Sequence, residues 1–242
     1  MTALRILAID ASTPRTAVAL GVVDPGHGVV DRLGGFDVID GANQASAWLI
    51  ERILELLARS GVEPRRIDRF ACGVGPGTFT GTRVAIATCK GLSLGTGSPV
   101  LAVSTLAAIA ASAPSDGRRL ATLDARRGEV YGALFDSRVD ASTLGGRILA
   151  RVSDDRCAPL EAHLVALDAD VAIVGTGVAG APPERASLLD GVTADGLWTA
   201  TLASLAAGPC PARDLDAVYL RGSYAELGLN QPKRPFVRSP FA

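Results

Sequence analysis

The sequence has 242 residues, a mass of 24.8 kDa and a formal net charge of −1. Because 48% of its residues are hydrophobic and 20% are charged, the chain can bury a core, which excludes wholesale disorder. The balanced charge argues against a polybasic protein that coats nucleic acid or membrane surfaces. About 102 Da per residue, with 27 glycines, indicates a protein built from small side chains.

Cysteine and histidine are too sparse to build the usual metal or nucleophile sites. Four isolated cysteines occur, at positions 72, 89, 157 and 210. Because no CxxC pair is present, the pattern predicts reduced thiols rather than disulfides or a zinc site. The two histidines, His27 and His163, form no HExxH pattern, and no GxSxG motif occurs. We therefore predict no metal site and no catalytic residue.

The apolar segments are too short to act as membrane spans or as a secretion signal. No apolar run reaches about 18 residues, the length that a transmembrane helix needs. The N-terminal apolar run ends at Asp10, which is too early for a signal peptide. These observations predict a cytoplasmic protein with no membrane partner.

Hydrophobic periodicity predicts strands and helices that alternate along the first half of the chain. Strands are expected at 4–10, 16–23, about 29–39, 67–73 and 100–103. Helices are expected at 43–60, at 81–95, and from Ser104 or Thr105 to about 113. The glycine-rich turn VGPGTFTG joins strand 67–73 to helix 81–95.

The same kinds of element return in the second half. Strands are expected at 119–124, 129–136 and 170–174, and a short strand or helix edge at 216–220. Helices are expected at 159–167 and 199–207. The tail from Gly222 onward is Pro-rich and basic, which is typical of a partly disordered terminus.

An internal repeat links the two halves. A shift of 114 residues places Asp10 and the strand before it on Asp124 and its strand, and a shift of 100 places Val74–Gly77 on Val174–Gly177. The two echoes occur in the same order and predict a duplicated α/β fold. The predicted units are residues 1–106, residues 107–222 and a basic tail at 223–242.

The repeated aspartates have two interpretations. In two-lobed proteins of the sugar-kinase and actin type, such hairpins face each other and their carboxylates hold a magnesium–phosphate group. Alternatively, each carboxylate caps its own turn through local backbone hydrogen bonds. The glycine turn matches neither a Walker A loop nor a Rossmann fingerprint, so its glycines either bind an anion or let the helix pack closely. The candidate vestigial nucleotide or phosphate site consists of Asp10, Gly75, Gly77, Asp124, Gly175 and Gly177.

Helix 81–95 carries small residues on two faces. One face holds Gly81, Ala85, Thr88 and Cys89, and another holds Val84, Ala87, Gly91 and Leu94. Such a helix can contact a sheet on one side and another helix on the other. Ordinary interior packing in an alanine-rich protein is the alternative.

Six segments together resemble the TsaB (also called YeaZ) family of the bacterial tRNA threonylcarbamoyladenosine machinery. They are ILAIDAS, GVGPGTFTGTRVAIATCKGLSLG, PVLAVSTLAAIA, LDARRGEVYGALF, VGTG and VYLR, in this order between residue 4 and about residue 222. The resemblance implies the two-lobed actin-like ATPase (sugar kinase/Hsp70/actin) fold, with a mixed β-sheet and flanking helices in each lobe. This implication agrees with the repeat.

The resemblance also implies a non-catalytic role. Family members are understood as degenerate paralogues of the catalytic subunit TsaD that bind TsaD, together with the ATPase TsaE. The complex uses ATP and transfers threonylcarbamoyl to adenosine 37 of ANN-decoding tRNAs, so this chain would meet tRNA indirectly and need no cofactor, with weak nucleotide binding left open. Members bind one another through helices of the first lobe, which correspond here to the predicted helices 43–60 and 81–95. The implied interface consists of Ala45, Trp48, Leu49, Arg52, Gly81, Thr82, Ala85, Thr88 and Cys89.

The sequence departs from the family pattern at Thr78, at Thr82 and at Gly41–Gln44. In the last of these segments many members carry a histidine. Two other functions are weighed against the scaffold. The first is an independent actin-like ATPase or small-molecule kinase that uses Asp10 and Asp124. The second is a peptidase, as relatives of TsaD were once labelled, and the missing histidines speak against it.

Overall fold

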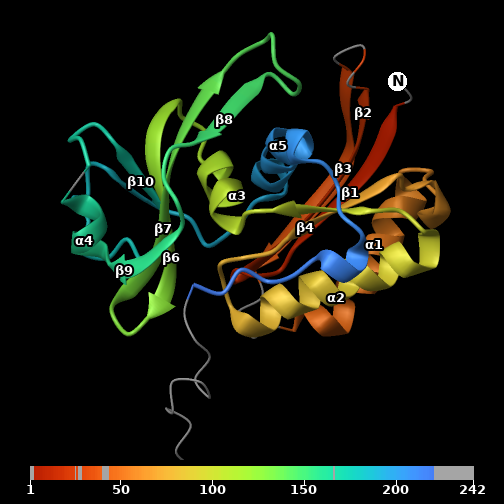
Figure 1. Cartoon of the computed structure of the whole chain (residues 1–242), viewed down its shortest axis with the longest axis horizontal. Coiled ribbons are helices and arrows are strands. Elements are labelled where there is room, and N and C mark those ends of the chain that lie inside the picture. The colour runs from red at the N-terminus through yellow and green to blue at the C-terminus, as the bar shows by residue number, and fades with distance from the viewer. Residues whose placement is uncertain (1–2, 25, 27–28, 40–43, 166, 221–242) are drawn as a thin grey trace, which may run out of the picture.

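The computed structural model describes residues 3–24, 26, 29–39, 44–165 and 167–220. Two mixed β-sheets stand side by side, with helices between them and on their outer faces (Figure 1). The predicted two-lobed α/β fold is thereby confirmed. His27, Gly41–Asn43 and the predicted tail at 223–242 lie outside the described residues. Among the helices that are described, none is long and apolar enough to cross a membrane.

The first sheet contains five strands from the first half of the chain. They are β1 (Leu4–Asp10), β2 (Arg15–Asp24), β3 (Val29–Ile39), β4 (Arg69–Gly73) and β5 (Val100–Val103). Their order is β3-β2-β1-β4-β5. The β1–β2 and β2–β3 pairs are antiparallel, whereas the β1–β4 and β4–β5 pairs are parallel.

The second sheet repeats this arrangement. Its strands are β6 (Gly117–Arg126), β7 (Glu129–Val139), β8 (Arg147–Arg151), β9 (Arg156–Pro159), β10 (Ala172–Gly175) and β11 (Ala186–Leu188). The order β8-β7-β6-β10-β11 has the same sequence of antiparallel and parallel pairs as the first sheet, and β9 is an additional partner of β7. Because an order with two parallel crossovers rarely recurs by accident, the shared topology supports the predicted duplication.

The strand registers correct one detail of the predicted repeat. Ala8 on β1 pairs with Ala71 on β4, and Thr122 on β6 pairs with Gly175 on β10. Since a shift of 114 residues carries Ala8 to Thr122, Gly175 is the structural equivalent of Ala71. The proposed match of Gly75 with Gly175 is therefore four residues out of register. Both glycines have positive φ angles, so the sequence echo reflects similar turn requirements.

Five α-helices complete the described fold. They are α1 (Ala45–Arg59), α2 (Phe79–Thr96), α3 (Thr105–Ser112), α4 (Leu160–Leu164) and α5 (Ala194–Ser204), with short 3₁₀ turns at Pro64–Arg66, Leu205–Ala207 and Ala212–Asp214. Three helices begin at a hydroxyl cap, since the side chains of Thr78, Ser104 and Thr193 accept hydrogen bonds from backbone amides of the first turn. Helix α2 ends at Gly97 in a left-handed conformation, a common helix terminator.

Helices α3 and α5 form the layer between the two sheets (Figure 1). Helix α3 contacts β6 and β7 of the second sheet, while α5 crosses back to contact β1, β2 and β5 of the first. A Cβ at Gly196 of α5 would lie 2.6 Å from the carbonyl oxygen of Ala108, so only glycine permits this helix contact. The two sheets are thus joined by α3, which packs on the second sheet, and by α5, which packs on the first.

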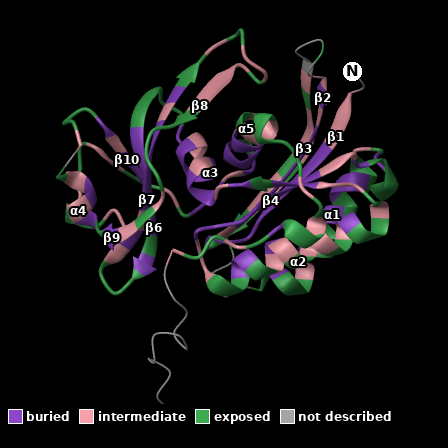
Figure 2. Ribbon diagram, in the orientation of Figure 1, coloured by how far each residue is buried: buried purple, intermediate pink, exposed green. Residues whose placement is uncertain are grey.

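The burial pattern follows these layers. Purple, buried strands and the inner faces of α3 and α5 occupy the centre of Figure 2, while α1 and α2 are green and pink on their outer side. One apolar cluster fills the space between the sheets and includes Phe135, Leu197 and Trp198. A second lies under α1 and α2 and includes Leu49 and Phe70.

The elements that differ from the predictions are mostly irregular or short. Residues 216–220 form no strand, because this segment runs along the glycine turn, with the Val218 amide donating to the Val74 carbonyl at 2.8 Å. Helix α5 begins at residue 194 instead of 199. The edge strands β8, β9 and β11 were not predicted. The segment after α5 returns to the first sheet, where Cys210 pairs with Val100. Because this segment of the predicted second unit contacts the first sheet, the division of the chain after residue 106 stays a prediction.

Candidate functional site

Asp10 lies at the end of β1 and is completely buried. Its Oδ1 accepts hydrogen bonds from the amide and hydroxyl of Ser12, at 2.8 and 2.6 Å, and its Oδ2 accepts one from Thr105 Oγ1 at 2.8 Å. Burial raises the pKa of Asp10, and the hydrogen bonds from Ser12 and Thr105 partly oppose that rise. A Cβ at Gly73 would overlap the carboxylate. Asp10 therefore fastens the β1–β2 turn to the start of α3 from inside the protein.

The glycine turn packs directly on the β1–β2 turn. The amide of Gly75 donates to Thr105 Oγ1 at 3.2 Å, and the amide of Thr78 donates to the Ser12 carbonyl at 2.7 Å. A Cβ at Gly77 would overlap Ser12, and one at Gly81 would overlap the carbonyl of Ala11. These contacts support the packing interpretation at Gly77, in which small residues bring α2 close to the sheet, whereas Gly75 has a positive φ of 95° that favours glycine.

Asp124 occupies the equivalent position on β6 but a different environment. Its side chain is 45% exposed, and its Oδ1 accepts a hydrogen bond from the Arg126 amide at 2.7 Å. The Asp124 amide donates to Thr176 Oγ1 at 2.9 Å. A Cβ at Gly177 would lie 3.3 Å from the Asp124 amide nitrogen, and one at Gly175 would overlap Thr122. Asp124 thus caps its own turn, which is the alternative interpretation of the aspartates.

The chain itself covers the β1–β2 turn. The Val192 amide, in the loop before α5, donates to Thr13 Oγ1 at 3.3 Å. Gly191 has a φ of 143°, and a Cβ there would overlap Thr13. Since Thr13 and Asp10 are both buried, the predicted use of Asp10 as a magnesium–phosphate ligand does not fit this geometry. Among the residues that the structure describes, no group of three metal-ligating side chains occurs.

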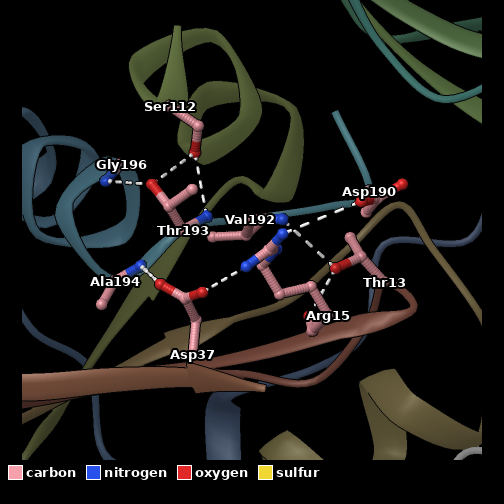
Figure 3. Close-up of polar contacts among 9 residues, drawn as sticks. All are labelled: Thr13, Arg15, Asp37, Ser112, Asp190, Val192, Thr193, Ala194 and Gly196. Carbon is pink, nitrogen blue, oxygen red and sulfur yellow. Dashed lines mark hydrogen bonds and ion pairs between the residues drawn. The ribbon is translucent and has the colours of Figure 1, made fainter. Parts of the chain in front are cut away.

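A polar network holds this loop in place (Figure 3). Arg15 on β2 forms an ion pair with Asp37 on β3 and a longer one, at 3.9 Å, with Asp190. The other carboxylate oxygen of Asp37 accepts a hydrogen bond from the Ala194 amide at 3.0 Å. Asp37 therefore serves as an acceptor for the start of α5, which lies between the sheets.

A second set of contacts joins the same loop to α3. The amide and the hydroxyl of Thr193 both donate to Ser112 Oγ, at 3.0 and 3.1 Å (Figure 3). Ser112 in turn donates to the Ala108 carbonyl. Thr193 also accepts a hydrogen bond from the Gly196 amide. The start of α5 is thus fixed to both lobes.

The predicted partner interface is mostly turned inward. Six of its residues are buried between the helices and the first sheet, namely Ala45, Leu49, Gly81, Thr82, Ala85 and Cys89. Trp48 is half-buried beside Phe36, with ring centroids 6.4 Å apart, and Thr88 is also half-buried, whereas Arg52 is exposed and pairs with Glu55. The buried six cannot contact a partner. A bulky charged side chain at the buried Ala85 would press against the sheet and disturb the fold.

The opposite side of the two helices faces outward and carries several exposed apolar residues among charged ones. Ile50 and Leu54 on α1 are about half exposed, and Leu94 on α2 is 83% exposed. Ala87 and Gly91 on α2 are also exposed, and a Cβ at Gly91 would meet nothing within 4 Å. We call Ile50, Leu54, Ala87, Gly91 and Leu94 the exposed helix face. Sequence periodicity missed its orientation because both faces of α2 consist of small residues.

Comparison with known proteins identifies the family. The family model described as "TsaD: tRNA N6-adenosine threonylcarbamoyltransferase" matches residues 29–154, about half of the chain. The solved structure of YeaZ from Pseudomonas aeruginosa is 30% identical, with a TM-score of 0.74, and the match covers 90% of this chain and 100% of that one. The chain belongs to the TsaB (YeaZ) family.

Curated TsaB relatives match a shorter part of the sequence. The Escherichia coli protein named "tRNA threonylcarbamoyladenosine biosynthesis protein TsaB" is 37% identical over 138 residues, and the Haemophilus influenzae protein of the same name is 34% identical over 134 residues. These matches cover 54% and 53% of this chain. They span only 55% and 57% of the relatives' own lengths.

Proposed function

We propose that this chain is a non-catalytic subunit of the complex that adds threonylcarbamoyl to N6 of adenosine 37 in ANN-decoding tRNAs. Its task is to bind and support the catalytic subunit TsaD, with TsaE as a further partner and tRNA as an indirect one. Membership of the TsaB family carries this proposal, since the curated relatives are named for threonylcarbamoyladenosine biosynthesis. The complex uses ATP and works in the cytoplasm, and this chain contributes no cofactor of its own.

The environment of Asp10 supports the non-catalytic part of the proposal. A carboxylate that coordinates magnesium must expose oxygen atoms to the metal and its water ligands. Both oxygens of Asp10 instead accept hydrogen bonds from Ser12 and Thr105 in a site without solvent exposure. Asp124 accepts a bond from its own turn. The alternative ATPase or kinase would need the first turn to open.

The exposed helix face supports the partner part. Its aliphatic and small side chains are exposed, and small residues such as Gly91 let another helix approach closely. The same helices carry the charged residues Glu51, Arg52 and Glu55 on α1 and Arg83 and Lys90 on α2. Protein interfaces usually combine exposed apolar residues with charged ones in this way. The same face serves self-association when TsaD is absent.

Reconstitution tests the proposed function. Cognate TsaD, TsaE, tRNA, ATP and a threonylcarbamoyl donor are combined with and without this chain, and modified adenosine is quantified. We expect modification to depend on the chain. Equal modification without it would contradict the proposal. Titration of the isolated chain with Mg-ATP separates the alternative: tight binding and turnover that are lost in Asp10→Asn would favour an independent enzyme.

A further inference from the structure

Three exposed side chains join the start of α2 to the last described residues of the chain. Phe79 is 47% exposed and Tyr219 is 49% exposed, and their ring centroids are 5.7 Å apart. The guanidinium carbon of Arg83 lies 3.7 Å from the centroid of the Phe79 ring, and Arg83 Nε donates to the Tyr219 hydroxyl at 3.1 Å. We call Phe79, Arg83 and Tyr219 the aromatic–arginine cluster.

Fixed backbone holds this cluster in place. Phe79 is the first residue of α2, and Arg83 lies one turn further along the same helix. On the other side, Leu215 is buried in the core under α1 and α2, and the Val218 amide donates to the Val74 carbonyl. A cluster that is ordered before binding loses less conformational entropy when a partner arrives.

The composition of the cluster fits a protein partner. Aromatic residues and arginine contribute a large share of the binding free energy at protein interfaces. Phe79 and Arg83 also lie on the same helix as Ala87, Gly91 and Leu94 of the exposed helix face. Helix α2 contains two cationic residues, Arg83 and Lys90, and no acidic one, which favours a partner that offers a carboxylate.

We propose that the aromatic–arginine cluster anchors one end of the interface with the catalytic subunit. The partner places an apolar side chain against the rings of Phe79 and Tyr219 and a carboxylate beside Arg83. This inference rests on the proposed function, and it adds the segment around Tyr219, more than 120 residues away in sequence, to an interface otherwise built from α1 and α2.

Dissociation constants between the full-length chain and cognate TsaD test the inference. We expect Arg83→Glu and Tyr219→Ala to raise the Kd by about tenfold or more, as is usual for aromatic and arginine residues that anchor an interface. Arg138→Glu, an exposed charge reversal on the second sheet, is the matched control and should leave the Kd unchanged. Because Arg83 meets a carboxylate, salt should weaken wild-type binding more steeply than binding of Arg83→Gln. A purely intramolecular role of Arg83 would not change that salt dependence.

The outcomes separate this inference from the proposed function. Urea unfolding of each variant first establishes that it is folded, and Tyr219→Ala and Arg83→Gln provide independent tests if Arg83→Glu is not. Failure of the wild type to bind TsaD would overturn both proposals. If the wild type binds TsaD and Arg83→Glu and Tyr219→Ala have unchanged Kd values, only the proposed role of the cluster in the interface is overturned. Loss of self-association or of tRNA binding, with TsaD binding intact, would also overturn it.

Discussion

The β1–β2 and β6–β7 turns are equivalent in topology, yet they have opposite environments. At the first turn, Asp10 is buried, hydrogen-bonded to Ser12 and Thr105, and covered by the loop before α5. At the second, Asp124 is partly exposed and caps its own turn. The repeated aspartate therefore marks a shared backbone architecture without a shared chemical role. The difference teaches that a duplicated motif must be read together with its burial.

Removal of the two carboxylates should show the largest contrast. Asp10→Ala leaves several buried donors without an acceptor and should lower the free energy of unfolding by about 3 kcal/mol. Asp124→Ala loses a partly exposed turn contact and should cost about 1 kcal/mol or less. Urea unfolding measures both values, with Asp10→Asn as a control that retains one acceptor oxygen. Equal losses of unfolding free energy at the two positions would contradict the difference in burial between Asp10 and Asp124.

The loop that covers the first turn gives the next largest effect. Gly191→Ala combines a positive φ with overlap on Thr13 and should cost about 2 kcal/mol. Gly128, in the uncovered second turn, also has a positive φ, but a Cβ there would meet nothing within 4 Å. Gly128→Ala should therefore cost only about 1 kcal/mol. If thermal unfolding shows that Gly191→Ala costs less stability than Gly128→Ala, the loop before α5 does not rest on the β1–β2 turn.

The Arg15–Asp37 ion pair, which helps to hold this loop, should contribute less to the free energy of unfolding. Asp37→Ala removes the partner of Arg15 and the acceptor of the Ala194 amide, and should cost about 1.5 kcal/mol. Asp168→Ala, which breaks the exposed pair with Arg118, should cost less than about 0.5 kcal/mol. Hydrogen exchange at the start of α5 should rise in the first variant and stay unchanged in the second. Unchanged exchange in Asp37→Ala would contradict this role.

The raised pKa of Asp10 also predicts the sign of a pH dependence. Because the folded-state pKa is raised above the value of 3.8 for a free side chain, the folded protein binds this proton more tightly than the unfolded chain. The contribution of Asp10 to stability is fully present below pH 3.8 and is lost as the pH rises through the folded pKa. Asp10→Asn lacks this titration, so its unfolding free energy relative to wild type should improve with rising pH. An opposite trend would mean that the hydrogen bonds outweigh desolvation.

Sequence patterns predicted the regular core better than the orientation of its faces. Strands 4–10 and 100–103 were predicted with the bounds of β1 and β5 because their apolar runs end at clear turn residues. The periodicity of α2 could not say which side meets the sheet, since Ala85 inside and Ala87 outside are chemically alike. Burial of Asp10 depends on the loop at Gly191, far away in sequence, and no local pattern reports it. Similarly, no signal in the sequence joins Tyr219 to Phe79.

The central claim is that this chain binds TsaD through the outward side of α1 and α2. Titration of wild type and Leu94→Glu into cognate TsaD tests it most directly, because Leu94 is 83% exposed and its replacement should leave the unfolding free energy nearly unchanged. Arg138→Glu also introduces an exposed carboxylate, but on the second sheet, and serves as the control. We predict that wild type and Arg138→Glu bind with the same Kd and that Leu94→Glu binds at least about tenfold more weakly. Equal binding by all three proteins, or no binding by any of them, would contradict the account.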